Sequence, residues 1–522
     1  MSLLPDDPVI YQIYPRSFRD TTGSGEGDLQ GILDRLEYVA SLGVDGIWLS
    51  PFYCTDFDDG GYDVCDHRAV DPRFGTIEDF DAIVAKAHEL GLGVMIDQVL
   101  NHVSHKHVNF EAALEGNEKM AQWFVFRDPN PDGTAPNNWL SQFGPPAWTW
   151  SHERRQYYLH QFLDCQPNLD MRHPDVQDDH RKTLRFWLDR GVDAFRLDAV
   201  TSYLHDENLR DNPPASFEVH DKVSGPNHNP YTYQDHRHDM IPGDGAAYME
   251  KIKQWGGEAC FLLGESTSGN KSVQLALDFT EPGRLDSVYT TDLPEAATDP
   301  GKIADALMAA QGRWGRLTWW LSSHDQPRSN SAHGDGSWAS ARFYQLLLSL
   351  LPGPLLIYQG QELGLPQPEL RQEEVTDPFD LLYWPEGPGR EGARVPIPWT
   401  SQGPGWGFTS GTPWLPMRWA EHDSVEHQEA AAESPLQFTR RSIAFRRKER
   451  LSRPDTFAAL SENDVLRLDI LLDGRGWRAL FNFSDTVPVD GDYGEPALSS
   501  GPLENGKLPP QTAAVWGYER KP

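Results

Sequence analysis

Short apolar runs alternate with amphipathic stretches along most of the 522-residue chain. Apolar residues between positions 28 and 43 recur at helical spacing and stop at a glycine, which predicts a helix, and residues 77–91 repeat this pattern. The apolar runs that separate such stretches predict buried strands. Eight runs qualify, at residues 9–18, 46–51, 93–100, 193–200, 259–266, 285–291, 317–325 and 355–360.

The order of these elements indicates the fold. Buried strands that alternate with helices pair in parallel with right-handed crossovers, and eight such units predict a closed α/β (β/α)₈ barrel, the TIM barrel. The alternation of strands and helices is interrupted after the third strand. Residues 103–170 are rich in Asn, Pro, Trp and His there and predict an inserted subdomain. Residues 451–522 hold short alternating runs between turn residues, which predict a C-terminal antiparallel β domain. Residues 1–102 and 171–450 would then form the barrel.

Charge and composition exclude several classes of protein. With 46 basic and 78 acidic residues the net charge is -32, and a field of that sign repels nucleic-acid phosphates. A highly solvated surface and adaptation to high salt both account for the surplus of acid. The sequence holds neither an apolar run long enough to span a membrane nor the features of a secretory signal. We therefore expect a cytoplasmic protein, monomeric or homodimeric, without a membrane or nucleic-acid partner.

The four cysteines, Cys54, Cys65, Cys165 and Cys260, form no CxxC motif. Their spacing therefore indicates neither a zinc site nor a disulfide framework, and we expect reduced thiols.

Polar residues gather where the predicted barrel strands end, which is where barrel enzymes place their active sites. They are Asp97, His102, Arg196, Asp198, Glu265, His324 and Asp325. Paired carboxyl groups suit the cleavage of a glycosidic bond, because one can protonate the leaving oxygen while the other attacks the anomeric carbon. Arg196 lies two residues before Asp198 on the same face of a strand and would keep that carboxylate ionised.

Four segments now carry a resemblance. DQVLNH (97–102), GVDAFRLDAV (191–200), LGES (263–266) and SSHDQ (322–326) resemble, in order, the signature regions of the α-amylase family of glycoside hydrolases. VIYQIYPRSF (9–18), QPNLD (166–170) and YQGQELG (358–364) are similar to its α-glucosidase and oligo-1,6-glucosidase branch. The resemblance spans essentially the whole chain. It implies an exo-acting, retaining enzyme that releases terminal α-glucose from short oligosaccharides and requires no cofactor.

The resemblance also implies roles for single residues. Asp198 would be the nucleophile and Glu265 the general acid/base, and Asp325 would be a third carboxylate that grips sugar hydroxyls. Substrate binding is implied for Asp59, Tyr62, His102, Phe143, Phe162, Gln166, Arg196, His324 and Arg394. In this interpretation Asp59 and Arg394 close the pocket at the non-reducing end. Retention predicts about 5–5.5 Å between the carboxyl groups of Asp198 and Glu265.

The residue after the nucleophile, Ala199, bears on specificity. In this branch a small alanine resembles the enzymes that prefer the α-1,4 linkage of maltose, whereas valine resembles the α-1,6-specific ones. An α-1,6-glucosidase, a sucrose isomerase, a trehalose-phosphate hydrolase and a dextran glucosidase stay open as alternatives, as does transglucosylation onto an alcohol. A non-catalytic amylase-like binding protein is disfavoured, because all three carboxylates are present.

The loop DTTGSGEGD (20–28) resembles the calcium loop of the family, with departures. Oxygen ligands for a structural Ca²⁺ or Mg²⁺ would come from Asp20, Thr22, Ser24, Glu26 and Asp28. Thr22 and Ser24 stand where the family has an amide and a carboxylate, so one formal charge is lost and the affinity should fall.

Overall fold

The computed structural model describes residues 3–220, 228–267, 269–270, 273–310, 312–387, 389–488 and 494–519. Its main sheet is parallel and has the strand order β11-β10-β9-β5-β2-β1-β12. The strands are β1 (Val9–Ile13), β2 (Gly46–Leu49), β5 (Gly93–Gln98), β9 (Ala194–Leu197), β10 (Phe261–Glu265), β11 (Ser287–Tyr289) and β12 (Leu355–Tyr358). Each lies within one of the runs predicted from the sequence.

The eighth predicted run, residues 317–325, fills the gap between β11 and β12 without forming a full strand. Leu317 pairs in parallel with Val288 of β11, and Trp319 pairs with Leu355 of β12. Pro354, just before β12, has no N–H to donate and interrupts the ladder at this point. The sheet nevertheless curls round to meet itself, so the predicted barrel is confirmed.

The barrel is filled by side chains. One buried cluster takes a residue or two from each strand: Ile10, Trp48, Met95, Ala194, Phe261, Leu263, Tyr289, Trp320 and Leu356. Large aromatic and aliphatic side chains therefore close the interior, as in other barrels of this size, and leave chemistry to the strand ends.

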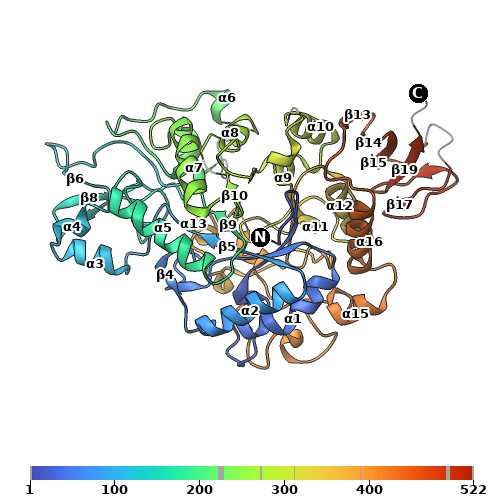
Figure 1. Ribbon diagram of the computed structural model, residues 1–522, viewed down its shortest axis with the longest axis horizontal. Helices are drawn as coiled ribbons and strands as arrows, with labels where there is room; N and C mark the ends of the chain where they lie inside the picture. Colours follow the sequence, from blue (N-terminus) through green and yellow to red (C-terminus); the bar gives the residue numbers. More distant parts are fainter. Residues whose placement is uncertain are drawn as a thin grey trace.

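Helices alternate with the strands and lie outside them (Figure 1). They are α1 (Leu29–Ser41), α2 (Ile77–Glu89), α5 (Pro174–Leu188), α7 (Pro242–Gly256), α8 (Val273–Phe279), α10 (Pro300–Met308), α12 (Trp338–Leu350) and α16 (Pro435–Lys448). The two helices predicted from residues 28–43 and 77–91 are confirmed as α1 and α2. Local capping explains where they begin: Asp28 caps α1, and Thr76 with Asp79 forms a capping box on α2.

Shorter helices lie in the connections. They are α3 (Val108–Leu114), α4 (Glu118–Ala121), α6 (Phe217–His220), α9 (Asp292–Ala296), α11 (Ser329–Ala332), α13 (Pro378–Leu382), α14 (Arg390–Ala393) and α15 (Val425–Ala430).

The segment between β5 and α5 contains α3, α4 and a small antiparallel sheet of order β6-β8-β7. Its strands are β6 (Phe126–Arg127), β7 (Trp148–Ser151) and β8 (Gln156–Leu159). Bridges from His102 to Asn168 and from Phe124 to Leu169 tie its two ends together beside the barrel. Before it, β3 (Tyr53–Thr55) and β4 (Val64–Val70) form a hairpin.

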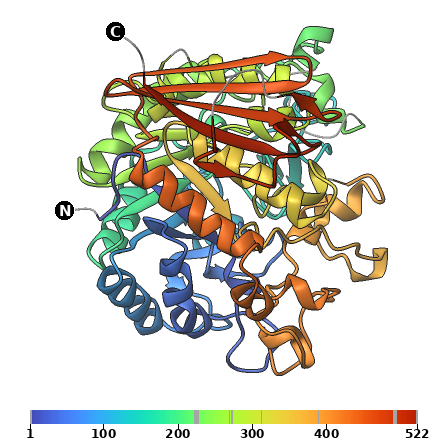
Figure 2. The same cartoon turned by 90° about the vertical axis from the view of Figure 1, so that its right-hand side faces the viewer.

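The chain ends in an antiparallel sheet of order β13-β14-β15-β19-β17, as predicted. Its strands are β13 (Thr456–Glu462), β14 (Val465–Leu472), β15 (Arg475–Asn482), β17 (Leu498–Ser499) and β19 (Ala513–Glu519), with a separate pair β16 (Val487–Pro488) and β18 (Lys507–Leu508). In Figure 1 this sheet and the α3–α4 segment lie at opposite ends of the long axis. Figure 2 faces the sheet, with α16 beside it. Phe343 of α12 packs edge-on against Phe481 of β15.

Within the described residues, no helix is both long and apolar enough to cross a bilayer.

Candidate active site

One buried arginine organises the carboxylates at the strand ends. Arg196 of β9 is 0% exposed. Its Nη1 atom lies 2.8 Å from Asp198 Oδ1 and 2.8 Å from Asp97 Oδ1, and its Nη2 atom lies 2.5 Å from Glu265 Oε2. The hydroxyl of Tyr289, at the end of β11, accepts from the same guanidinium group at 2.8 Å. Strands β5, β9, β10 and β11 thus meet at a single cation.

This arrangement brings the two predicted reacting groups together. Asp198 follows β9 directly and Glu265 ends β10, so parallel pairing of the two strands sets them side by side. Each contacts a different terminal nitrogen of Arg196. The backbone N–H of Ala199 also donates to Glu265 Oε2 at 3.0 Å, from a left-handed conformation with φ 43°. An L-residue at positive φ is uncommon and costs about 1–2 kcal/mol. The turn after β9 is therefore built to present Asp198 and to hold Glu265.

Burial works against the ionisation of Asp198. Desolvation raises the pKa of its carboxyl group well above the ordinary value, while the positive charge of Arg196 opposes that rise and Glu265 adds to it. The sequence led us to expect that Arg196 would keep Asp198 ionised. The arginine makes the expected contact, and its positive charge offsets part of the rise in pKa that burial causes.

The loop between β3 and β4 carries Asp59 and Tyr62 to the same place. Asp63 anchors this loop, because its carboxylate accepts from Thr55 Oγ1 at 2.8 Å and from the backbone N–H of Asp56 at 3.0 Å. Two glycines permit the turn. Gly60 has φ 60°, and a Cβ atom there would lie 2.7 Å from Arg394 Nη1. Glycine at position 60 of DDGGYD (58–63) is therefore explained by its positive φ and by the close approach of Arg394.

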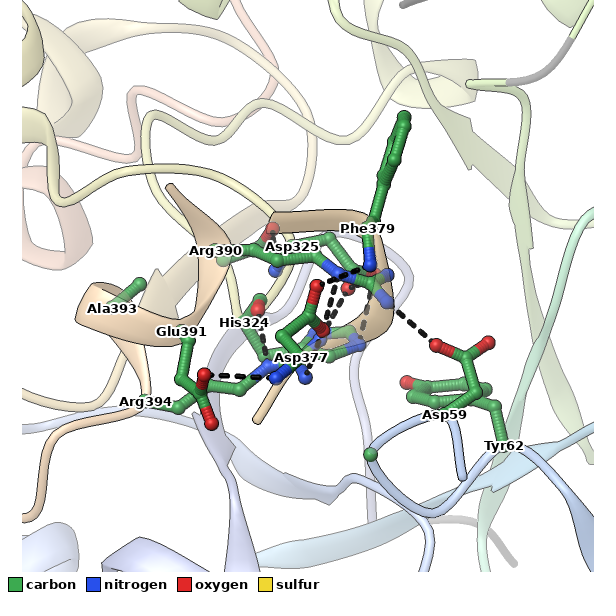
Figure 3. Close-up of polar contacts among 12 residues, drawn as sticks. Asp59, Tyr62, His324, Asp325, Asp377, Phe379, Arg390, Glu391, Ala393 and Arg394 are labelled. Atoms are coloured by element: carbon green, nitrogen blue, oxygen red, sulfur yellow. Dashed lines mark hydrogen bonds and ion pairs between the residues drawn. The ribbon is translucent and has the colours of Figure 1, made fainter. Parts of the chain in front are cut away.

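The expected partner of Asp59 was wrong. Asp59 Oδ1 pairs with Arg390 Nη2 at 2.6 Å and not with Arg394 (Figure 3). Arg394 lies one turn further along the chain and contacts Asp325 Oδ1 at 2.9 Å and the carbonyl oxygen of His324 at 2.9 Å. The two arginines lie four residues apart, and only the packing of the loop decides which of them reaches Asp59.

Asp377 explains how the two arginines are held. It is 3% exposed, and its Oδ2 atom lies 2.7 Å from Arg390 Nε and 3.0 Å from Arg394 Nη1. Figure 3 shows this carboxylate between the two guanidinium groups. The planar fork of Arg390 thus joins Asp377, Asp59 and Asp325, the last at 3.4 Å. The rings of Phe143 and Phe379 lie 5.4 and 5.7 Å from its guanidinium carbon.

These groups surround a pocket of about 390 Å³. Among the residues predicted from the sequence, its lining includes Asp59, Tyr62, His102, Phe143, Phe162, Asp198, Ala199, Glu265 and Asp325. The lining also includes Gln142, Thr267, Thr291, Glu295, Gln326, Pro327, Phe379 and Arg390, which sequence reasoning missed. The segment GREGARVPIPW (389–399) holds both Arg390 and Arg394, and the sequence prediction chose Arg394.

The other predicted residues lie behind the pocket wall and position it. Gln166 Nε2 donates to Asp59 Oδ2 at 3.0 Å and lies 3.1 Å from His102 Nε2. The His324 ring stacks on Tyr62 with centroids 5.2 Å apart, and its Nε2 atom lies 2.9 Å from Asp325 Oδ2. Burial lowers the pKa of His102 to about 3, so this ring is neutral.

The loop at residues 20–28 does not fit a cation site. Both oxygens of Asp20 accept from protein donors, among them the backbone N–H groups of Gly23 at 2.9 Å and Gly25 at 2.8 Å. Asp28 caps α1 and accepts from the backbone N–H of Thr21 at 2.7 Å. Glu26 pairs with Arg16, whose Nε lies 2.9 Å away. The Thr22 hydroxyl donates to Asp20 Oδ1, and that of Ser24 donates to the Glu26 carbonyl oxygen. The oxygens therefore point to different donors and not to one centre.

Comparisons with known proteins identify the family to which this chain is similar. The family model described as "Alpha amylase, catalytic domain" matches residues 12–454. A probable α-glucosidase of Rhizobium meliloti (strain 1021) is 43% identical over 84% of this chain and 82% of its own length. The trehalose-6-phosphate hydrolase of Escherichia coli (strain K12) is 35% identical over 78% of this chain and 77% of its own. The crystal structure of the α-glucosyl transfer enzyme XgtA superposes with a TM-score of 0.91 at 38% identity and covers 100% of both chains.

The four signature segments, the barrel that carries their carboxylates to one pocket and the family match over residues 12–454 lead to one conclusion: this chain belongs to the α-amylase family of glycoside hydrolases.

Proposed function

We propose that this protein is an exo-acting, retaining α-glucosidase that prefers the α-1,4 linkage of short oligosaccharides such as maltose. The observation that carries the proposal is the closed end of the pocket. Asp59, Arg390 and Asp325 form a chain of ion pairs across it, at 2.6 and 3.4 Å. A pocket that is sealed on one side admits a single terminal glucose and leaves the bond to the next sugar at its mouth.

In this mechanism Asp198 attacks the anomeric carbon while Glu265 gives its proton to the leaving glycosidic oxygen. A covalent glucosyl–Asp198 ester and a shortened sugar result. Glu265 then takes a proton from water, and the water oxygen attacks the same carbon and releases α-glucose. Arg196 contacts both carboxylates, so it can balance the charge that moves between them.

Asp325 has the opposite electrostatic environment to Asp198. His324 and the two arginines Arg390 and Arg394 lower the pKa of its carboxyl group well below the ordinary value. Asp325 therefore stays ionised over the working pH range, which suits a group that holds sugar hydroxyls by charged hydrogen bonds.

Two finer points belong to the same proposal. Ala199 lines the pocket beside Glu265 and leaves room near the second sugar, which favours the α-1,4 over the α-1,6 linkage. Similarity to an α-glucosyl transfer enzyme over the full chain supports transfer to an alcohol acceptor as a second outcome of the same glucosyl-enzyme. A phosphorylated substrate is less favoured. Among the described lining residues Arg390 alone is cationic, and three carboxylates already surround it.

Proton NMR of the purified protein with maltose, isomaltose, sucrose and trehalose 6-phosphate in parallel tests the proposal. We expect early release of the α-anomer of glucose from maltose, with slower release from isomaltose. Faster cleavage of isomaltose would overturn the linkage preference and leave the mechanism standing. Early β-glucose would overturn retention. Conversion of sucrose into an isomer without free glucose would identify an isomerase, and cleavage of trehalose 6-phosphate alone would identify a phosphotrehalase.

A further inference from the structure

A second cluster of polar side chains lies outside the pocket, on the back of two of its walls. The carboxylate of Asp58, the imidazole of His105 and the thiol of Cys165 come together, with their ligand atoms all within 4.8 Å of one another. Each comes from a different segment: the β3–β4 loop, the turn after β5 and the stretch after β8. The backbone fixes two of them, because the N–H of His105 donates to the carbonyl oxygen of Cys165 at 2.7 Å.

These three groups have no other use in the described structure. Within the described residues, no hydrogen bond or ion pair engages the side chain of Asp58, His105 or Cys165. Their neighbours do have partners: Lys106 pairs with Asp56 at 2.9 Å, and Asp63 anchors the loop. The cluster therefore offers three solvent-accessible ligand atoms of different chemical types, an oxygen, a nitrogen and a sulfur.

We propose that Asp58, His105 and Cys165 form a binding site for a thiophilic divalent cation of the Zn²⁺ class. A thiolate, an imidazole and a carboxylate are the three kinds of protein ligand that zinc accepts, and a water molecule can complete the tetrahedron. No sequence motif indicates this site, because its ligands are spread over more than 100 residues and none belongs to a CxxC motif.

The geometry is close to what zinc requires. Bond lengths of about 2.0–2.3 Å to oxygen, nitrogen and sulfur place tetrahedral ligand atoms about 3.3–3.6 Å apart. The three ligand atoms all lie within 4.8 Å of one another, so they need to approach by at most about 1.5 Å. Asp58 can supply that movement, because it is exposed at the tip of a loop, whereas His105 and Cys165 are half-buried.

Access and charge also favour a cation. A solvent-connected cavity of about 330 Å³ adjoins the cluster and includes His105 and Cys165 in its wall. Asp56, Asp58 and Asp63 lie together in the same loop and give it a negative field. Binding must displace the thiol proton, and burial, which raises the pKa of Cys165, sets part of the cost.

The position of the site gives it a consequence for the pocket. Asp58 precedes Asp59, which lines the pocket, and Cys165 precedes Gln166, which lies behind the pocket wall and donates to Asp59 at 3.0 Å. A cation would therefore clamp together, from behind, the two segments that hold the closed end of the pocket.

Cobalt(II) is the probe for the test, because a thiolate ligand gives it a charge-transfer absorption in the near ultraviolet that oxygen ligands do not. We expect the full-length, reduced protein to show this band with a 1:1 end point, and added Zn²⁺ to abolish it by displacement. Cys165→Ser should lose the band. Cys54→Ser is the matched control, a half-buried cysteine outside the cluster, and should keep it.

His105→Gln is the second variant, and it guards against misfolding of Cys165→Ser. It should keep the thiol and weaken Co²⁺ binding at least tenfold. A protein without the band, a band that survives in Cys165→Ser, or unchanged affinity in His105→Gln would each overturn the proposal. Loss of the band in Cys54→Ser would show that Co²⁺ binds at Cys54, and this result would also overturn the proposal. The absorption does not depend on glucosidase activity, so this test is separate from that of the proposed function.

Discussion

The ion pair between Asp59 and Arg390 offers the sharpest test of the closed pocket. Asp59→Asn removes the charge of this carboxylate and keeps its shape. In the wild type the carboxylate accepts from Arg390 Nη2 at 2.6 Å and from Gln166 Nε2 at 3.0 Å, and it is 5% exposed. Arg390 stays in place in the variant, because Asp377 still holds its Nε atom at 2.7 Å.

The size of the effect follows from the bonds that change. Hydrogen bonds to charged groups contribute about 1.5–3 kcal/mol, against about 1 kcal/mol for neutral ones. The variant weakens the bond to Arg390, and we expect Asp59 also to bind a hydroxyl of the terminal glucose, so that a second charged bond is weakened. Each change from a charged to a neutral bond costs about 0.5–2 kcal/mol, so the two together give about 1–4 kcal/mol, which is roughly a 5- to 1000-fold loss in kcat/KM. Because that hydroxyl is held in the ground state and the transition state alike, most of the loss should appear in KM.

The assay is steady-state hydrolysis of p-nitrophenyl α-glucoside and of maltose. Asp58→Asn is the matched control, since Asp58 is the exposed neighbour and does not line the pocket; all variants are assayed with a chelator present, so that no cation occupies the site proposed at Asp58. Like other surface substitutions it should change kcat/KM by about twofold or less. Wild-type kcat/KM in Asp59→Asn, or an equal loss in Asp58→Asn, would refute the assignment of Asp59 to the closed end.

Four further predictions follow from the site and its surroundings. Arg196→Ala leaves buried carboxylates unpaired and should lower the free energy of unfolding by about 3–5 kcal/mol in urea titrations; a loss below about 1 kcal/mol would contradict the charge balance. Because Asp198 must be ionised and its pKa is raised, kcat/KM should fall with acid at a pH above the ordinary carboxyl value of about 3.9. Excess Ca²⁺ or Mg²⁺ should leave Tm unchanged, because hydrogen-bond donors of the protein occupy the carboxylates of Asp20 and Asp28. A rise in Tm would show that the loop at residues 20–28 does bind a cation. His180 is buried and its folded pKa is lowered to about 3, so the unfolded chain binds the extra proton and stability falls as the pH drops below about 6.5. His180→Phe should reduce the stability lost between pH 6 and pH 4 by about 2.5 kcal/mol, and an unchanged loss would show that this histidine is not buried neutral.

The sequence by itself determined the barrel and predicted which carboxylates would meet at the ends of its strands. The runs that became β5, β9 and β10 are mostly apolar and buried along their whole length, and such runs are stable only when both faces are covered. Parallel strands in one sheet all end at the same edge. A carboxylate that follows such a run, as Asp198 does, therefore meets the others whatever the loops do.

The sequence could not determine which side chains complete the pocket from the loops. The segment that carries Arg390 and Arg394 has no hydrophobic periodicity that would predict which side chains face the pocket. The sequence alone therefore could not distinguish the two arginines. The choice depends on Asp377 between them and on Gly60 against Arg394, and Gly60 lies more than 300 residues away. Long-range packing also buries Asp198 and so raises the pKa of its carboxyl group, an effect that the spacing of Arg196 and Asp198 does not reveal.

Long-range packing also decided where the sequence prediction of a cation site was wrong and where a cation site was missed. In residues 20–28 the spacing of oxygens resembled a calcium loop, and only the fold showed their donors, including Thr409 from a distant segment. Asp58, His105 and Cys165 have no motif, and the fold makes them neighbours. A local sequence pattern determines whether a segment forms a helix or a strand, because the spacing of its apolar residues and its capping hydrogen bonds involve only residues close together in the chain. Which side chains meet across loops depends on the packing of the whole chain, and only the tertiary structure decides it.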